Sequence, residues 1–189
     1  MAKTRKKKTA AQSKAKPKTK PKKAGSWPQS RQVMFRPERL NYVRKMVKPD
    51  GCVFCAAREA GVGSESLLLA VHGDAMLVMN KYPYNAGHLL VLPKRHVGNF
   101  NDLTAKEAAD IFALQQKAVH ALKDLYNPGG FNMGLNLGSV AGAGIPDHLH
   151  WHIIPRWPGD SNFFPLIAET KVVIETLEQT FERLVPYFT

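Results

Sequence analysis

The sequence predicts an α+β domain with an antiparallel sheet. Two strand-like segments, residues 67–72 and 75–79, are joined by Gly73-Asp74, a pair that suits a two-residue hairpin turn. Helical periodicity is strongest over residues 104–126, so helices and strands occupy separate parts of the chain. Hairpin strands with segregated helices are typical of helices that pack on an antiparallel sheet.

The same kinds of signal assign the other elements in chain order. Proline is favoured in the first turn of a helix, so Pro37 indicates a helix start. Thr104-Ala105-Lys106-Glu107 is a capping box that opens the longest helix. We expect about five strands, one long helix and a C-terminal helix. The further segments are a helix at 37–46, a turn at 48–51, strands at 88–92, 131–137 and 148–154, a helix stop at 127–130, a glycine-rich loop at 138–144 and a helix at 173–184.

The positive charge of the chain is concentrated in its first residues. Eleven of the 27 Lys and Arg residues lie within residues 1–24, and the other 165 residues carry 16 basic and 15 acidic side chains. The segment has no large apolar side chain after Met1, so we expect a disordered Lys-rich tail at 1–26 and one domain at 27–189. Two interpretations of the tail stay open: an arm that binds nucleic acid non-specifically by releasing counterions, or a solubilising spacer without a partner.

Several classes of protein are excluded by composition. No apolar run approaches the roughly 18–20 residues of a membrane span, so no membrane partner is expected. No apolar segment of about 7–15 residues follows the charged N-terminus, which excludes a secretory signal. Cys52 and Cys55 are the only cysteines and cannot form a disulfide framework. We therefore expect a reducing compartment and a cytoplasmic protein.

Three histidines alternate with apolar residues over 148–152. Because strand side chains alternate between faces, His148, His150 and His152 are expected on one face, about 6.6–6.8 Å apart along the strand. Three interpretations are open: a solvated polar face, a metal site, or a nucleophilic imidazole that attacks phosphorus while its neighbours orient it. The glycine-rich loop before the strand favours the third, because its N–H groups can bind phosphate oxygens.

The residues around this strand carry a family resemblance. His148-Leu149-His150-Trp151-His152-Ile153-Ile154 resembles the histidine-triad (HIT) signature, and residues 80–91 resemble that family's nucleotide-binding strand pair. Residues 136–138 and 141–144 are similar to its Asn-x-Gly and Ala-Gly loop, so the resemblance covers a core at about 52–165. Residues 34–43 and 155–165 are similar to bacterial dinucleoside tetraphosphate phosphorylase-like members. One departure is Gly144-Ile145-Pro146-Asp147, where the family usually has a polar pair.

The resemblance implies an enzyme, a HIT-like fold and a homodimer. It implies that His150 is the nucleophile and that His152 contacts the phosphate and the bridging oxygen. It places Asn80 and His88 near the nucleoside, and Asn136, Gly142 and Gly144 at the phosphates. No organic cofactor is implied.

The expected reaction is cleavage of a dinucleoside polyphosphate, such as diadenosine tetraphosphate (Ap4A), through a nucleotidyl-His150 intermediate. Inorganic phosphate is favoured over water as the acceptor. The alternatives are a hydrolase of nucleoside phosphoramidates, an asymmetric dinucleotide hydrolase, a metal-dependent hydrolase that binds its metal through all three histidines, and a nucleotide- or nucleic-acid-binding module with little catalysis.

Cys52-x-x-Cys55 allows three interpretations: a redox pair, two buried free thiols, or half of a zinc site. A tetrahedral zinc site needs two further ligands. The HIT resemblance implies that they are His96, in the segment Pro93-Lys94-Arg95-His96, and His148. We therefore expect a structural zinc ion bound by these four residues.

Overall fold

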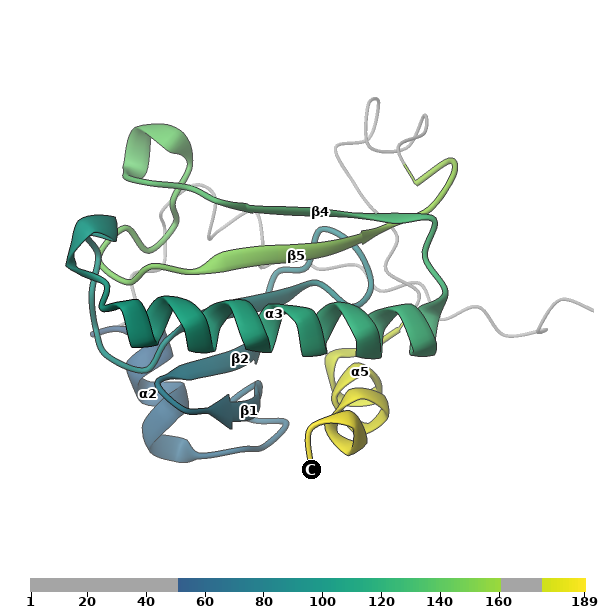
Figure 1. The fold of residues 1–189 in the computed structure, drawn as a ribbon. Coiled ribbons are helices and arrows are strands. Elements are labelled where there is room, and N and C mark those ends of the chain that lie inside the picture. Colours follow the sequence, from purple (N-terminus) through teal and green to yellow (C-terminus); the bar gives the residue numbers. More distant parts are fainter. Residues whose placement is uncertain (1–50, 161–174) are drawn as a thin grey trace, which may run out of the picture. The chain divides into compact units, whose positions relative to one another are not determined.

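A computed structural model describes residues 51–160 and 175–189. In this part of the chain, five strands form one sheet in the order β1-β2-β3-β5-β4, and all neighbouring pairs are antiparallel (Figure 1). The strands are β1 (Leu68–His72), β2 (Ala75–Met79), β3 (Leu89–Pro93), β4 (Gly130–Leu135) and β5 (Trp151–Arg156). The α+β prediction is confirmed. The tail at 1–26 and the helix expected at 37–46 lie outside the described residues.

The helices are α2 (Val53–Ala60), α3 (Ala105–Tyr126) and α5 (Leu177–Leu184). The capping box of α3 is formed as predicted: the Glu107 N–H donates to Oγ1 of Thr104, and the Thr104 N–H donates to Glu107. The helix ends where Asn127 adopts a left-handed conformation, with φ of 43°. None of the helices in residues 51–160 and 175–189 is long and apolar enough to cross a bilayer.

The β1–β2 hairpin turns at Gly73 and Asp74, as the sequence predicts, and its turn packs on α3. Gly73 has φ of +55°, which favours glycine, and a Cβ atom there would lie 2.3 Å from the carboxylate of Asp110 and would displace it. The Asp74 N–H donates a hydrogen bond of 2.8 Å to the same carboxylate. The hairpin and the long helix are therefore fixed to each other.

The two faces of the sheet are covered by different helices. On one face, Leu77 and Val91 pack with Leu114 of α3 and Leu184 of α5, and α3 runs across this face (Figure 1). On the other face, alternate residues of β2 and β3, together with one residue of β1, pack around Phe54 of α2: Leu68, Met76, Val78, Leu90 and Leu92. Both faces of the central strands are thus buried, which is why β2 and β3 are apolar throughout.

Several boundaries differ from the sequence prediction. The C-terminal helix, expected at 173–184, begins at Leu177, because Thr176 caps it by accepting from the Gln179 N–H. Strand β4, expected at 131–137, ends at Leu135. Helix α2 occupies residues that were expected only to follow a turn, and its cap residue Cys52 makes no side-chain capping bond. Strand β5 begins at Trp151 rather than at residue 148, because the Leu149 N–H donates to the carbonyl of Val97, outside the ladder between β3 and β5. The differences at α2 and β5 depend on contacts between residues far apart in sequence.

Candidate active site

The three histidines of residues 148–152 lie together on the face of the sheet that carries α2. Ring centroids of His150 and His152 are 5.2 Å apart. The Phe54 ring lies 5.4 Å from His148 and 5.2 Å from His150. His148 is fully buried and His150 is 6% exposed, so the solvated polar face considered for this segment is wrong.

The hydrogen bond of His150 determines which of its nitrogens can react. Its Nδ1 lies 2.8 Å from the carbonyl oxygen of His148. A carbonyl only accepts, so Nδ1 carries the proton and Nε2 keeps its lone pair. Burial lowers the pKa of His150 below its usual value, and the ring is therefore neutral at pH 7. A neutral imidazole with an unprotonated Nε2 is a competent nucleophile.

A fourth histidine, His88, determines the tautomer of His152. The Tyr84 N–H donates to Nδ1 of His88 over 3.1 Å, so the proton of the neutral His88 ring is on Nε2. This Nε2 lies 2.9 Å from Nδ1 of His152 and donates to it. Burial, followed by the repulsion that two protonated rings, His150 and His152, would exert on each other, lowers the pKa of His152 to about 4. His152 is therefore neutral and carries its proton on Nε2, where it can be donated to a substrate oxygen.

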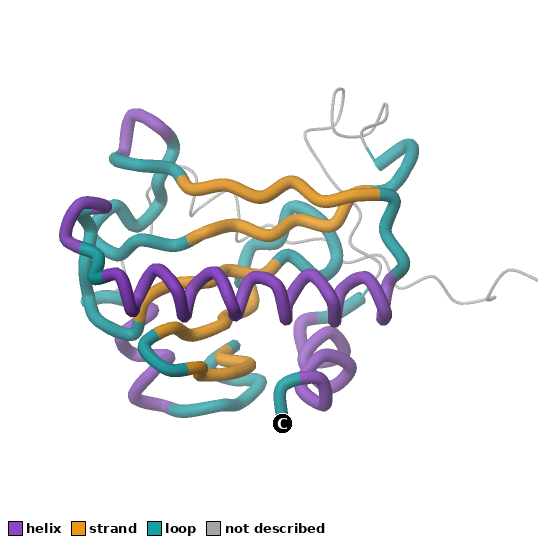
Figure 2. Tube along the Cα trace, in the orientation of Figure 1, coloured by secondary structure: helices purple, strands orange, loops and turns teal. Residues whose placement is uncertain are grey.

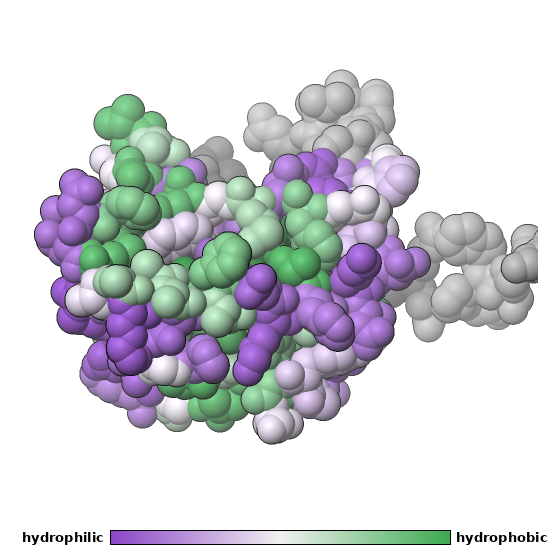
Figure 3. Space-filling view, viewed as in Figure 1, coloured by the Kyte–Doolittle hydropathy of each residue, from purple (hydrophilic) through white to green (hydrophobic). Residues whose placement is uncertain are grey.

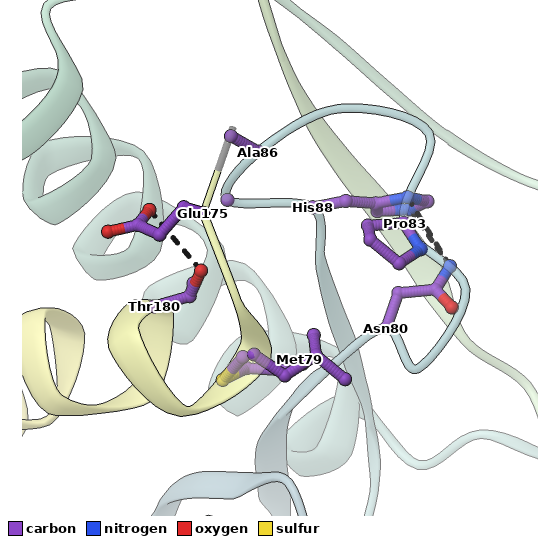
Figure 4. A pocket seen from close by; sticks show the side chains of 9 residues that line it. Met79, Asn80, Pro83, Ala86, His88, Glu175 and Thr180 are labelled. Carbon is purple, nitrogen blue, oxygen red and sulfur yellow. Dashed lines mark hydrogen bonds between the residues drawn. The ribbon is translucent and has the colours of Figure 1, made fainter. Parts of the chain in front are cut away.

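Asn80 lies beside His88 at the end of β2 (Figure 4). Its amide nitrogen is 3.3 Å from Nδ1 and 3.4 Å from Nε2 of His88, and its Oδ1 accepts from the Tyr82 N–H. His88 is only 2% exposed. The structure thus brings His88 into the histidine cluster, with Asn80 at its edge, whereas the resemblance implied only that both lie near the nucleoside.

The glycine-rich loop joins β4 to the histidines and projects beyond the ends of these strands (Figure 2). Asn136 is half-buried, and a Cβ atom at Gly142 would lie 3.7 Å from its amide nitrogen, so these two residues are neighbours. Gly142 has φ of +95°, a conformation that glycine favours, and Gly142 and Gly144 are exposed. The loop therefore lies at the surface. The N–H groups of Gly142 and Ala143 donate to the carbonyls of Ser139 and Gly138 within the loop, over 3.1 and 3.2 Å.

A second cluster adjoins the histidines and contains Cys52, Cys55, His96 and His148. Their ligand atoms lie within 4.8 Å of one another. Nδ1 of His148 is 3.3 Å from the Cys52 sulfur, and Nδ1 of His96 is 3.5 Å from the Cys55 sulfur. Ligands of a tetrahedral zinc ion at about 2.0–2.3 Å from the metal are separated by about 3.3–3.8 Å. Nδ1 of His148 is also 3.8 Å from the Cys55 sulfur, so these three nitrogen–sulfur separations fall in that range.

The orientation of His148 also fits a metal ligand. Its Nε2 donates to the carbonyl of Pro93 over 2.9 Å, which leaves the lone pair of Nδ1 directed at the thiols. The three histidines therefore do not converge on a common point: Nδ1 of His148 faces Cys52, whereas Nδ1 of His150 and of His152 are used elsewhere. This arrangement argues against one catalytic metal bound by all three.

Three residues that shape this site have no signal of function in the sequence. Phe54 contacts two histidines, and the backbone of Tyr84 sets the tautomer of His88. Gly98 supports the segment before the triad, because a Cβ there would lie 2.8 Å from Cα of Asp147. Each acts through a contact distant in sequence, and only the glycine is a residue type that could have drawn attention.

Comparisons with known proteins agree with this geometry. A model of the HIT domain matches residues 64–159. The chain is 39% identical over 156 residues to the AP-4-A phosphorylase of Mycobacterium tuberculosis, which is 79% of this chain and 80% of that protein. It is 34% identical over 101 residues to the asymmetrical bis(5'-nucleosyl)-tetraphosphatase of Schizosaccharomyces pombe, covering 53% of this chain and 52% of that one.

Among solved structures, a zinc-bound histidine triad family protein from Mycobacterium smegmatis shares the fold. The TM-score is 0.58, with 24% identity over 72% of this chain and 92% of that protein. Its likeness concerns the arrangement of strands and helices alone. The family match and the relatives above lead to one conclusion: the chain belongs to the HIT family and is one of its enzymes.

Proposed function

We propose that this enzyme cleaves dinucleoside polyphosphates of the Ap4A type through a nucleotide covalently bound to His150. The observation that carries the proposal is the hydrogen bond from Nδ1 of His150 to the His148 carbonyl, which leaves Nε2 as the nucleophilic atom. The relatives named as a phosphorylase and a tetraphosphatase support this substrate class.

The first step forms a bond between Nε2 of His150 and the α-phosphorus. It breaks the bond from phosphorus to the bridging oxygen, so that a nucleoside polyphosphate leaves. The Nε2 proton of His152 stabilises the charge that develops on that oxygen. The exposed loop with Asn136, Gly142 and Gly144 would contact the phosphate oxygens, and Asn80 and His88 would border the nucleoside.

The second step returns His150 to its free form. An acceptor oxygen bonds to phosphorus as the bond to Nε2 breaks. We propose inorganic phosphate as the acceptor. The Mycobacterium tuberculosis relative, of which 80% aligns with this chain, is named a phosphorylase. Water as the acceptor would make the protein an asymmetric hydrolase or a phosphoramidate hydrolase. Both alternatives share the first step.

Two measurements test the reaction. Ap4A labelled at the α-phosphate is mixed with the full chain, and an acid-labile adduct on His150 is expected. Turnover with and without phosphate is then resolved into ATP, ADP and AMP. ADP and ATP at saturating phosphate support phosphate as acceptor, whereas AMP and ATP without ADP identify a hydrolase. Turnover without any adduct would overturn the covalent mechanism, and binding without turnover would leave a nucleotide-binding module.

A structural zinc ion is proposed for Cys52, Cys55, His96 and His148. It would add to the free energy of folding through its thiolate ligands. The ring of His148 faces the cysteines, whereas its carbonyl accepts from His150. The metal would therefore not contact the substrate. It would hold the backbone that orients the nucleophile.

Two partners complete the proposal. Apolar side chains are exposed around α3 and along β4, the edge strand of the sheet, and they gather on the face that Figure 3 shows. Phe112 is 62% exposed, and Phe100 and Met133 are each 48% exposed, which suits an interface between two copies of the chain.

We also propose that residues 1–24 bind nucleic acid without sequence preference, and that the protein is cytoplasmic.

A further inference from the structure

A buried carboxylate joins the C-terminal helix to the end of α3. Glu175, two residues before α5, is 8% exposed. Its side chain accepts hydrogen bonds from the hydroxyl of Tyr126 over 2.5 Å and from the guanidinium of Arg183 over 2.6 Å. Thr180 donates a third bond of 3.3 Å, which Figure 4 shows. Because an unpaired buried carboxylate is unfavourable, these partners hold the two helices in one arrangement.

Tyr126 is held on several sides. The guanidinium of Arg183 lies over its ring, 4.8 Å from the centroid. Burial, followed by the hydrogen bond to Glu175, raises the pKa of the Tyr126 hydroxyl, so the hydroxyl stays protonated as a donor. The Trp157 ring, which follows β5, contacts Tyr126 edge to face at 6.5 Å. The position of the Tyr126 ring is therefore defined by Glu175 and Arg183, at α5, and by Trp157, directly after β5.

The Tyr126 ring supports the backbone directly before His88. A Cβ atom at Gly87 would lie 2.8 Å from Leu122 and 3.2 Å from the Tyr126 ring, and the φ angle of Gly87 is +69°. Gly87 thus turns tightly over the end of α3, in a conformation that favours glycine. The next residue, His88, places its Nε2 2.9 Å from Nδ1 of His152. A chain of contacts therefore runs from Glu175 through Tyr126 and Gly87 to His88.

The far side of the same loop has its own tether. Asn85 is 4% exposed and donates to the carbonyl of Pro155 over 2.7 Å and to Asp160 over 2.8 Å. These bonds fix the middle of the loop to β5 and the segment after it. The Asn85 carbonyl also accepts from the His88 N–H over 3.2 Å, so the loop before His88 is held by Asn85 as well as by the Tyr126 ring at Gly87.

We propose that Tyr126 is a positioning residue for nucleotidyl transfer, held by Glu175 and Arg183 of the C-terminal segment. By supporting Gly87, it keeps the His88 ring at the distance that fixes the proton of His152 on Nε2. The inference rests on the proposed function in one respect, namely that His152 donates this proton toward the leaving oxygen. The C-terminal helix is then a part of the catalytic scaffold and not only of the core.

The test compares Tyr126→Phe with Tyr187→Phe in the full chain. Tyr187 also belongs to the C-terminal segment and donates to a carboxylate of α3, that of Asp124, over 2.7 Å. Its ring is exposed, so the control removes a similar bond that does not support the loop. Tyr126→Phe is expected to lower kcat for Ap4A by about 5- to 30-fold with KM changed less than twofold, and Tyr187→Phe to leave both within twofold.

The leaving group separates positioning from simple stability. Adenosine 5'-(p-nitrophenyl phosphate) has a leaving group that needs little help from a hydrogen-bond donor. With this substrate, the effect of Tyr126→Phe is expected to fall below about threefold. An equal loss on both substrates, or a loss that follows the fraction of unfolded protein in melting curves, would overturn the proposal. Glu175→Gln, which keeps an acceptor for the Tyr126 hydroxyl, is expected to retain more activity than Glu175→Ala.

A readout without substrate keeps this inference distinct from the proposed function. The Nε2 proton of His88 is expected to give a slowly exchanging signal in ¹⁵N–¹H spectra of the imidazoles. Tyr126→Phe is expected to speed its exchange with water at least tenfold, and Tyr187→Phe to leave it unchanged. Unchanged exchange in both variants contradicts the positioning role. A changed signal in a protein that does not turn over Ap4A would reject the proposed function alone.

Discussion

The carbonyl oxygen of His148 accepts a hydrogen bond from Nδ1 of His150 over 2.8 Å, while the ring of His148 lies 3.3 Å from the sulfur of Cys52. His148 thus connects the cysteine cluster, through its ring, to the proposed nucleophile His150, through its backbone. The fit of the cluster to a tetrahedral ion and the direction of the reacting lone pair are therefore consequences of the same local geometry.

Replacement of His150 is the most direct test of the proposed mechanism. His150→Ala removes the atom that bonds to phosphorus, so we expect at least about a 10³-fold loss of kcat and no labelled adduct. His152→Ala is expected to cost less, because the loop would still contact the phosphate. His120→Ala, on the exposed surface of α3, is the control and should match the parent. An active His150→Ala enzyme would exclude a covalent intermediate on this residue.

Loss of the metal is expected to affect both folding and catalysis. Protein purified without chelator should contain one zinc ion per chain, and a chelator should lower Tm. Cys55→Ser should reduce the bound zinc and, because His148 orients His150, also lower kcat at temperatures well below Tm. His72→Gln lies outside the cluster and serves as the control. Zinc-free protein whose thiols titrate freely while it stays folded and active would refute the site.

Acid stability should depend on Glu107. Hydrogen bonds from Arg95 are the main cause that lowers its pKa from 4.5 to about 2. A carboxyl with a lowered pKa stabilises the folded state above pH 4.5, and this contribution is lost as the pH falls from 4.5 toward 2. Glu107→Gln should therefore reduce the free energy of unfolding by about 1–3 kcal/mol at pH 7, and the difference should shrink near pH 2.

Urea denaturation at several pH values measures this difference. Glu59→Gln is the control, because Glu59 is 73% exposed and pairs with Arg58 over 3.7 Å at the surface. That change should alter the free energy of unfolding by less than about 1 kcal/mol at any pH. A pH-independent difference for Glu107→Gln would show that the carboxylate acts through packing rather than charge.

The basic tail is expected to bind nucleic acid weakly and to leave catalysis unaffected. Eleven positive charges in residues 1–24 adjoin a nearly neutral domain, so affinity for DNA of mixed sequence should fall steeply with salt. Deletion of residues 1–24 should remove this binding while kcat for Ap4A stays within twofold. Unchanged, salt-insensitive DNA binding after the deletion would place the nucleic-acid site elsewhere or exclude one.

Local signals predicted most of the described fold. The hairpin at Gly73 and the capping box at Thr104 depend on a few adjacent residues, and both are formed as expected. Helix α2 was missed because it has eight residues and no side-chain cap, and its place is determined by packing of Phe54 in the core. Short helices without caps give little signal in the sequence.

The site shows the same limit. Alternation placed the three histidines on one face, and they do lie together there. The contact between His88 and His152 joins residues 64 positions apart, so no local pattern could predict that His88 sets a tautomer. The start of β5 at Trp151 likewise follows from the bond between Leu149 and Val97.

Association of two chains is the last prediction. Phe112 on α3 and Met133 on β4 are exposed, and β4 is an edge strand of the sheet that residues 51–160 and 175–189 form. Two copies that meet along this edge would cover the apolar side chains and pair the strands, which makes a symmetric dimer favourable. Phe112→Glu places a charge in the proposed interface and should shift the protein from dimer to monomer.

Sedimentation velocity at micromolar concentration measures the change. Val71→Glu is the matched control, because Val71 is 47% exposed on β1, the opposite edge of the sheet, and a charge there should leave the dimer intact. The contacts between β4 and β5 place Gly134 opposite His152, so dimerisation through β4 would also stabilise the strand that carries His152. Phe112→Glu is therefore expected to lower Tm. The Tm of the parent should rise with protein concentration, whereas that of the variant should not depend on it. A parent chain that sediments as a monomer would reject the interface.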